Sequence, residues 1–168
     1  DEGVASAIGA GMRIDQPYGR MNIDIGGGRT NVSVFSFGHQ IVWDILNVGG
    51  DRFDDAISDY LRKKHNLLIG ARTAEELKID IGSARMRGVK LEMDACGRSL
   101  VSGLPRAVTV NSEEMIEALD EPLRDLAQAW DEVSWRIATL RDNPECAAQE
   151  LCDKLRELDM TGGSGEER

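Results

Sequence analysis

The feature that most constrains the fold is residues 21–35, where three glycines separate two β-prone segments. The first segment ends in a carboxylate, Asp24, and the second alternates Val32 and Val34 with polar residues. Glycine between two such segments predicts a β-hairpin with a tight turn. A turn made only of glycine, residues 26–28, has no side chain to keep another molecule away. Its N–H groups can therefore converge on an anion such as phosphate.

Two interpretations of the glycine turn stay open at this level. Short glycine runs recur by chance, and Gly-Gly-Gly can be only a permissive hairpin turn. The alternative is a phosphate-binding loop. In that case Asp24 would hold Mg²⁺ through water, because this cation prefers carboxylate and phosphate oxygens. The rest of the chain decides between the two.

Composition is typical of a globular protein and excludes several classes. The 168 residues are 41% hydrophobic and 30% charged, with a formal net charge of −10. No basic stripe is present, so we expect no nucleic-acid partner. No apolar run approaches the roughly 20 residues that a membrane-spanning helix needs. The three cysteines have no CxxC spacing, which favours buried free thiols over a disulfide framework or a zinc site. They are Cys96, Cys146 and Cys152.

A second glycine motif follows the hairpin. We expect a third strand over residues 41–48, which completes a three-stranded meander. Residues 49–50 are both glycine, and Asp51 is expected to cap a helix. The glycine pair is either a plain strand-to-helix turn or a place where a ligand can approach the helix N-terminus. The predicted apolar stripe of this helix is Phe53, Ile57, Tyr60 and Leu61.

The middle of the chain alternates helix and strand signals. Thr73 and Glu76 have capping-box spacing and predict the start of a second helix. Its expected inward residues are Ala74, Leu77, Ile81 and Ala84. From residue 89 to 95 the apolar period is two, which predicts a strand. A turn is expected at 96–98, with short strands at 99–102 and 106–110.

The last third is predicted to be helical. Asn111 or Ser112 is expected to cap a long helix that continues to Leu140. Pro122 lies inside this span and predicts a kink or a break. Residues 143–144 are Asn-Pro, an N-cap followed by proline at the first helical position, and predict a final helix.

Seven short motifs follow one another along the chain. They are Asp24-Ile-Gly-Gly-Gly-Arg-Thr30, Val48-Gly-Gly-Asp-Arg-Phe-Asp54, Leu68-Ile-Gly70 with Arg72-Thr-Ala-Glu-Glu-Leu-Lys78, Ile81-Gly-Ser-Ala84, Gly103-Leu-Pro-Arg106, Glu117-Ala-Leu-Asp-Glu-Pro122 and Thr161-Gly-Gly163. Each motif is weak alone. In this order, over nearly the whole chain, they resemble the second half of the MreB family of bacterial actins, within the superfamily of actin, Hsp70 and sugar-kinase ATPases.

The resemblance implies an α/β fold, the second half of an actin-like ATPase. An inner RNase H-like subdomain would hold residues 1–50 and 112–168, and a smaller outer α+β subdomain residues 51–111. The whole protein would be a cytoplasmic, ATP-binding cytoskeletal protein. It would form filaments at the inner face of the cell membrane and maintain rod shape. Expected partners are further copies of itself and membrane-anchored cell-elongation proteins of the RodZ type. Membrane contact would be made through parts absent from this chain.

The resemblance also assigns a site for ATP and Mg²⁺. The loop glycines would surround the β- and γ-phosphates, and Asp24 would hold the metal through water. Glu2 would orient the attacking water, with Arg29 and Thr30 completing the catalytic set. The implied nucleotide-binding residues are Asp24, Gly26, Gly27, Gly28, Gly49, Gly50, Glu75, Glu76, Lys78, Gly162 and Gly163. Of these, the resemblance places Glu75, Glu76 and Lys78 on the adenosine. Gly162 and Gly163 would lie on the other side of the nucleotide.

Three departures from the family pattern bear on catalysis. Arg29 stands where family members have a Thr that helps to hold the catalytic water. Gly3 stands where they have Pro, and Ser164 where a third Gly is expected. ATP hydrolysis is therefore left open, and this chain alone is expected to be inactive. The alternatives are a catalytically degenerate interaction module, or a half-domain of another ATPase of the superfamily such as a sugar kinase or a chaperone.

Overall fold

The computed structural model describes residues 1–86 and 88–142, which fall into two compact units. Unit 1 comprises Asp1–Ile23, Val32–Asp44 and the chain from Trp130, and unit 2 comprises Asp24–Asn31 and Ile45–Ala129. The predicted inner and outer subdomains follow other boundaries and stay a prediction. Three predicted features lie outside the described residues. They are the final helix expected to begin at residues 143–144, the glycine loop with Gly162 and Gly163, and two of the cysteines.

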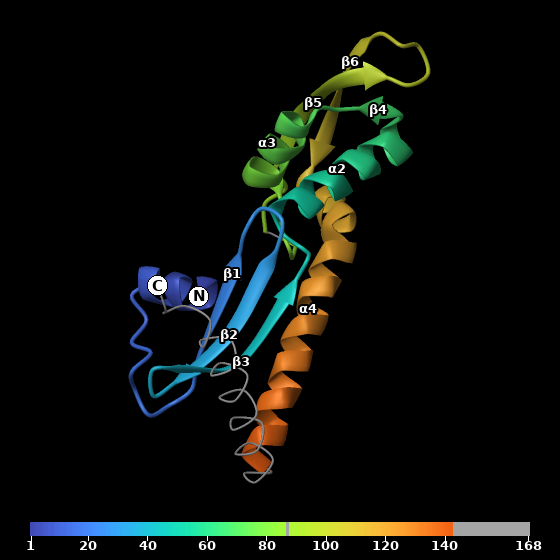
Figure 1. The fold of residues 1–168 in the computed structure, drawn as a ribbon. Coiled ribbons are helices and arrows are strands. Elements are labelled where there is room, and N and C mark those ends of the chain that lie inside the picture. Colours follow the sequence, from blue (N-terminus) through green and yellow to red (C-terminus); the bar gives the residue numbers. More distant parts are fainter. Residues whose placement is uncertain (87, 143–168) are drawn as a thin grey trace, which may run out of the picture. The chain divides into compact units, whose positions relative to one another are not determined.

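Helices are interspersed with two groups of consecutive strands along the chain (Figure 1). The elements are α1 (Glu2–Gly9), β1 (Arg20–Ile25), β2 (Thr30–Ser36), β3 (His39–Leu46), α2 (Gly50–His65), β4 (Leu67–Leu68), α3 (Ala71–Ile81), β5 (Glu92–Ser99), β6 (Pro105–Asn111) and α4 (Ser112–Asp142). None of the helices in this described part has the length and apolar character that a membrane span requires.

The predicted three-stranded meander is confirmed, with strand order β1-β2-β3. The central strand β2 is buried from Thr30 to Phe35 and has a neighbouring strand on each edge. Phe37 and Gly38 make the turn into β3, and both have positive φ, 51° and 80°. Two-residue hairpin turns of this kind match the twist of the strands they join.

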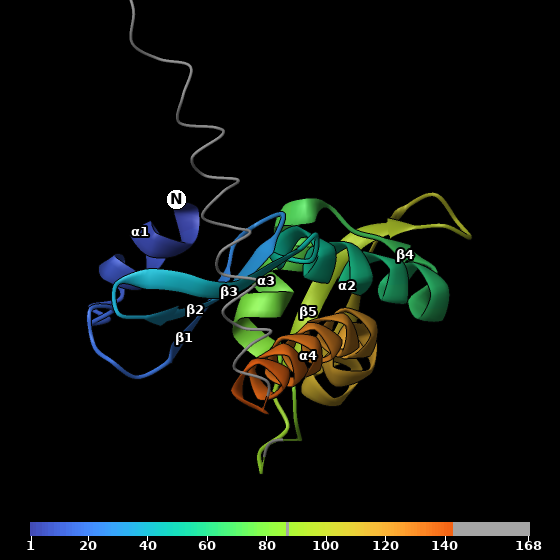
Figure 2. The ribbon, with the colours of Figure 1, turned by 60° about the horizontal axis from the view of Figure 1, so that its bottom comes forward.

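Small residues let α1 lie close to the sheet of unit 1 (Figure 2). A Cβ atom on Gly3 would lie 2.6 Å from the Ser33 hydroxyl oxygen. That oxygen accepts a hydrogen bond of 3.1 Å from the Gln40 amide, and the Asn22 amide donates to the Ser6 hydroxyl at 3.0 Å. A residue with a side chain at position 3 would force Ser33 to move. The glycine at this departure from the family pattern therefore fits its surroundings.

Unit 2 has its own core, formed where α2, α3 and the start of α4 meet the sheet β4-β5-β6. The buried residues are Ile57, Leu61, Leu67, Ile69, Ala74, Leu77, Ile81, Ala95, Val110, Met115, Ala118 and Leu119. The apolar spacing predicted for α2 and α3 is confirmed at Ile57, Leu61, Leu77 and Ile81. Ala84 is exposed instead, because α3 ends at Ile81.

The turn predicted at residues 96–98 is wrong, because β5 continues to Ser99. Gly97 pairs with Arg106 on β6, and a Cβ atom on Gly97 would lie 2.4 Å from the carbonyl oxygen of Leu68. This glycine therefore admits the edge strand β4 rather than turning the chain. The short strand expected at 99–102 is wrong too, since the turn lies there. Cys96 is exposed, against the expected buried thiol, because it falls on the outward phase of the strand.

Helix starts differ from the predictions in two of three cases. The N-cap of α2 is Gly49 and that of α3 is Gly70, and neither has a side-chain cap. Asp51 and Thr73 therefore lie inside their helices and cap nothing. In α4 the predicted cap is confirmed. The Asn111 side-chain oxygen accepts from the backbone N–H groups of Glu113 and Glu114 at 3.1 and 3.2 Å.

Of the two outcomes predicted at Pro122, the break is wrong, because α4 continues through it to Asp142, and the kink stays a prediction. Proline removes one backbone hydrogen bond from a helix interior. The Pro122 ring is fully buried, so the free energy gained by packing offsets the cost of the missing hydrogen bond.

Candidate functional site

The two glycine motifs of the sequence form one hydrogen-bonded structure in unit 2. The turn between β1 and β2 closes through a bond of 2.9 Å from the Gly26 N–H to the Arg29 carbonyl. The carbonyl oxygens of Gly26 and Gly27 then accept from the N–H groups of Gly50 and Asp51, each at 2.9 Å. The first turn of α2 is therefore capped by the glycine turn, and no side-chain cap is needed.

Gly49 is the glycine that this junction requires. A Cβ atom on Gly49 would lie 2.4 Å from the Gly27 carbonyl oxygen and 2.6 Å from that of Gly26. Its φ of −156° is available to any residue, so the restriction is one of space. The sequence left two interpretations of the glycine pair open, a plain strand-to-helix turn or a place where a ligand can approach the helix. At Gly49 the approaching group is the protein's own backbone.

The glycine turn has backbone N–H groups that are available to bind an anion. The N–H groups of Gly27 and Gly28 have no hydrogen-bond partner among residues 1–86 and 88–142, and both glycines are exposed. A Cβ atom on Gly28 would meet nothing within 4 Å, and one on Gly27 would lie 3.7 Å from the Asp51 carboxylate. A phosphate here would be repelled by that carboxylate unless a cation lay between them. The arrangement thus fits a phosphate accompanied by a divalent metal.

Asp24, the predicted metal residue, is half-buried on β1 beside the turn. Its side chain makes no hydrogen bond or ion pair with a described residue. No group of three or more His, Cys, Asp or Glu within the described ranges is placed to hold a metal ion unaided. Mg²⁺ usually takes one or two carboxylates and completes its shell with phosphate oxygens and water. A single Asp fits that pattern, and its predicted role stays a prediction.

Of the three residues expected at the adenosine, Lys78 lies beside the glycine motifs. Its ammonium group donates to the Gly50 carbonyl oxygen at 3.1 Å and lies 2.8 Å from the Asp54 carboxylate. Glu76 instead pairs with Arg72 one turn earlier on α3, at 3.0 Å, and Glu75 is exposed. Whether the three share a ligand stays a prediction.

The predicted catalytic residues belong to different units: Arg29 and Thr30 to unit 2, and Glu2 to unit 1. Thr30 is fully buried in unit 2, and its hydroxyl donates to the Val48 carbonyl at 2.6 Å. Arg29 is exposed at the end of the glycine turn. Glu2 belongs to unit 1, where it is exposed in the first turn of α1. The catalytic roles of these three residues stay predictions.

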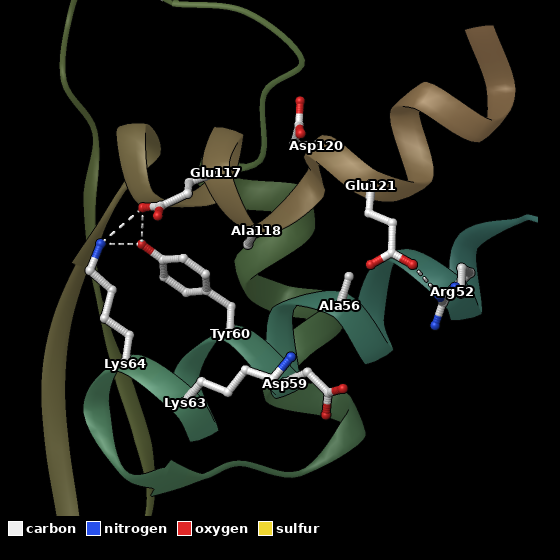
Figure 3. A pocket seen from close by; sticks show the side chains of 10 residues that line it. All are labelled: Arg52, Ala56, Asp59, Tyr60, Lys63, Lys64, Glu117, Ala118, Asp120 and Glu121. Carbon is white, nitrogen blue, oxygen red and sulfur yellow. Dashed lines mark hydrogen bonds and ion pairs between the residues drawn. The ribbon is translucent and has the colours of Figure 1, made fainter. Parts of the chain in front are cut away.

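A polar groove between α2 and α4 in unit 2 was missed by sequence reasoning (Figure 3). Its volume is about 510 Å³, and it is lined by Arg52, Ala56, Asp59, Tyr60, Lys63, Lys64, Glu117, Ala118, Asp120 and Glu121. Tyr60 donates to the Glu117 carboxylate at 2.6 Å, and Lys64 donates to the same carboxylate at 2.9 Å and to the Tyr60 hydroxyl. The spacing of Tyr60 and Lys64 on one helix was visible in the sequence. Their partner, 57 residues from Tyr60, was not.

The three groups of this cluster shift one another's ionisation. Hydrogen bonds from Tyr60 and then from Lys64 lower the pKa of Glu117. The hydrogen bonds to Tyr60 and then to Glu117 raise the pKa of Lys64. Partial burial, followed by the hydrogen bond to Glu117, raises the pKa of Tyr60. The cluster is therefore fully formed only while Glu117 is charged and both other groups keep their protons.

We expect this cluster to make the stability of the chain depend on pH at both extremes. The contribution of Glu117 is present above the ordinary carboxyl value of 4.5 and is lost as pH falls through the lower folded pKa. That of Lys64 is present below 10.5 and is lost as pH rises through the higher folded pKa. Urea midpoints measured from pH 3 to 11 should show that Glu117→Gln removes part of the acid limb. The change will be small because the groups are exposed. Identical acid limbs in the two proteins would contradict the prediction.

Three features together define part of an actin-like α/β protein. They are the three-stranded meander, the glycine turn and the glycine pair at the start of α2. The same fold is seen in solved structures. MreB5 of Spiroplasma citri bound to AMPPNP matches with a TM-score of 0.76 and 37% identity, over 79% of this chain and 40% of that chain. The MamK double helical filament matches with a TM-score of 0.61 and 16% identity, which supports the fold alone.

The chain belongs to the MreB/Mbl family, because the family model described as MreB/Mbl protein matches residues 1–166. It is 40% identical to the cell shape-determining protein MreB of Escherichia coli (strain K12) over 163 residues, 97% of this chain and 45% of that protein. It is 41% identical to the cell shape-determining protein Mbl of Bacillus subtilis (strain 168), over 97% of this chain and 46% of that protein. The chain thus spans less than half the length of these relatives. The family and the fold class predicted from the sequence are confirmed.

Proposed function

We propose that the full-length protein is an ATP-binding cytoskeletal protein of the MreB type, which forms filaments and maintains cell shape. The observation that carries the proposal is the exposed glycine turn, whose Gly27 and Gly28 N–H groups have no described partner. The match to MreB5, a relative whose solved structure holds AMPPNP, supports a nucleotide as the anion. Two relatives named for determining cell shape support the cellular role.

In this proposal the chain supplies one side of a nucleotide site. Gly27 and Gly28 donate to phosphate oxygens, and Asp24 orients water molecules around Mg²⁺, which neutralises phosphate charge when it is bound. The proposal keeps Glu2 as the residue that orients the attacking water, Arg29 and Thr30 in the catalytic set, and Gly162 and Gly163 among the nucleotide-binding residues. ATP favours a closed, filament-competent conformation only to the extent that this state contacts it better. The chain alone offers one wall and should bind ATP–Mg²⁺ poorly.

Self-association is proposed to involve the segment 51–111. Val101 and Leu104, in the turn between β5 and β6, are 82% and 66% exposed. Two large apolar side chains at the tip of one hairpin are suited to contact another copy. The proposal also places the filament at the inner face of the cell membrane, with membrane-anchored partners of the RodZ type.

The alternative is an interaction module that keeps the actin fold and has lost catalysis. Arg29 favours it, because an arginine cannot hold a water as the short hydroxyl of Thr does. It can still tighten ground-state ATP binding, which does not by itself accelerate chemistry. Phosphate release by the full-length protein separates the two functions, since only an active ATPase releases phosphate above background.

Sedimentation of the full-length protein tests the cytoskeletal proposal. We expect pelleting in the presence of ATP–Mg²⁺ and little without nucleotide. Val101→Asp and Leu104→Asp should abolish pelleting while nucleotide affinity stays unchanged. Ile8→Asp is the matched control, because Ile8 is 61% exposed and lies outside the segment 51–111. If both hairpin variants pellet like the parent protein, the contact lies elsewhere. If the parent neither binds ATP nor pellets, the proposed function is wrong.

A further inference from the structure

One peptide group, between Gly50 and Asp51, is hydrogen-bonded at both of its ends. Its carbonyl oxygen accepts from the Lys78 ammonium at 3.1 Å, and its N–H donates to the Gly27 carbonyl at 2.9 Å. The preceding N–H, that of Gly50, donates to the Gly26 carbonyl at 2.9 Å. A side chain on α3 is therefore linked to the glycine turn through a single peptide group at the start of α2.

The ammonium at this peptide is itself held in place. The Lys78 nitrogen lies 2.8 Å from the Asp54 carboxylate, and the side chains of the two residues are only 25% and 17% exposed. Partial burial weakens screening by water, so the pair is stronger than an exposed ion pair. A cation at a carbonyl oxygen polarises the peptide and makes its N–H a better donor. The bond from Asp51 to the Gly27 carbonyl should therefore strengthen while Lys78 is in place.

We propose that Lys78 and Asp54 form a positioning pair for the glycine turn. Asp54 fixes the ammonium, the ammonium polarises the Gly50–Asp51 peptide, and this peptide holds the Gly27 carbonyl and with it the free N–H groups of the turn. The inference rests on the proposed function in one respect, that this turn receives phosphate. It also implies regulation. A ligand oxygen that accepts from Lys78 competes with the Gly50 carbonyl, so binding beside α3 is sensed at the phosphate turn.

Nuclear magnetic resonance of the 168-residue chain without nucleotide tests the pair directly. In Lys78→Met, which keeps the aliphatic stem and removes the charge, the Asp51 amide proton should move upfield. Its hydrogen exchange should accelerate about tenfold, as expected for weakening one charge-assisted hydrogen bond. Amides of Ile57 and Leu61, in the middle of α2, should keep their exchange rates and so report that the unit is folded. Lys63→Met is the matched control, because Lys63 is an exposed lysine of α2 with no ion-pair partner in the described part of the chain.

A double-mutant comparison separates positioning from general packing. Asp54→Asn should shift the Asp51 amide in the same direction as Lys78→Met. The double variant should shift it no further than Lys78→Met alone, because both changes act through one ammonium. An unchanged Asp51 amide in Lys78→Met, or additive shifts in the double variant, would overturn the proposal. So would faster exchange at Ile57 and Leu61, since that would indicate loosening of the whole helix. No nucleotide is present, so failure of ATP binding in the full-length protein would sink the proposed function and leave these results standing.

Discussion

Gly49→Ala is expected to lower the free energy of unfolding of the chain by about 1–3 kcal/mol, the cost of forcing an extra methyl group into a filled space. The new Cβ atom would lie 2.4 Å and 2.6 Å from the carbonyl oxygens of Gly27 and Gly26, and 2.8 Å from the Arg29 backbone nitrogen. All three are main-chain atoms, which cannot rotate away as the end of a side chain can. Relief therefore requires the glycine turn and the start of α2 to separate, with loss of the two hydrogen bonds between them.

Urea denaturation followed by far-UV circular dichroism measures this effect. Gly28→Ala is the matched control, because a Cβ atom there meets nothing within 4 Å. Its stability should stay within about 0.5 kcal/mol of the parent chain, as for surface substitutions in general. Equal stability of the two variants would show that the junction between the glycine motifs is looser than the structure describes.

Gly27→Val is expected to reduce ATP binding by the full-length protein roughly 100-fold or more, since two hydrogen bonds to charged phosphate oxygens would be lost. The branched side chain would fill the space in front of the Gly27 and Gly28 N–H groups. The fold should survive, because a Cβ atom at this position lies 3.7 Å from the Asp51 carboxylate, an ordinary contact distance. Gly27→Val thus separates binding from stability, whereas Gly49→Ala damages both.

Isothermal titration calorimetry with ATP–Mg²⁺ decides the outcome. Gly88→Val serves as the control, because a Cβ atom there also meets nothing within 4 Å and the residue lies outside the glycine motifs. Normal affinity in Gly27→Val would return the glycine turn to its simpler interpretation, a permissive hairpin turn without a ligand.

Periodic apolar patterns made the helices and strands predictable. Rules based on neighbouring residues failed where a segment far away in the sequence supplies the cap or occupies the space. The apolar residues of α2 and α3 were found because burial recurs every three or four residues, as at Ile57 and Leu61. The start of α2 was misplaced because its cap comes from the Gly26 and Gly27 carbonyls, more than 20 residues earlier, and no pattern around Asp51 reports them. Gly97 was predicted to form a turn for the same reason. Glycine is needed there because the backbone of β4 lies too close for a side chain.

The site was predictable as a set of motifs but not as a set of contacts. The glycine turn and the glycine pair were both singled out, yet their direct hydrogen bonding was not foreseen, nor was the demand for space at Gly49. Lys78 was assigned by resemblance to the adenosine, while its pairing with Asp54 joins residues 24 positions apart on two helices. Such contacts depend on how helices pack, which a local pattern does not encode.

The capping of α2 by the glycine turn makes this helix a lever. Its 16 residues, from Gly50 to His65, extend about 24 Å at 1.5 Å per residue. Its first turn is hydrogen-bonded to the Gly26 and Gly27 carbonyls. Its C-terminal end is capped by Asn66, in a left-handed conformation, just before β4. A rotation of about 5° at the glycine turn would displace the far end by about 2 Å, the scale of helix shifts that accompany switching in other proteins. A change of well under 1 Å in the spacing of a few backbone atoms is thereby magnified at β4, which pairs with the strand leading to the exposed hairpin tip.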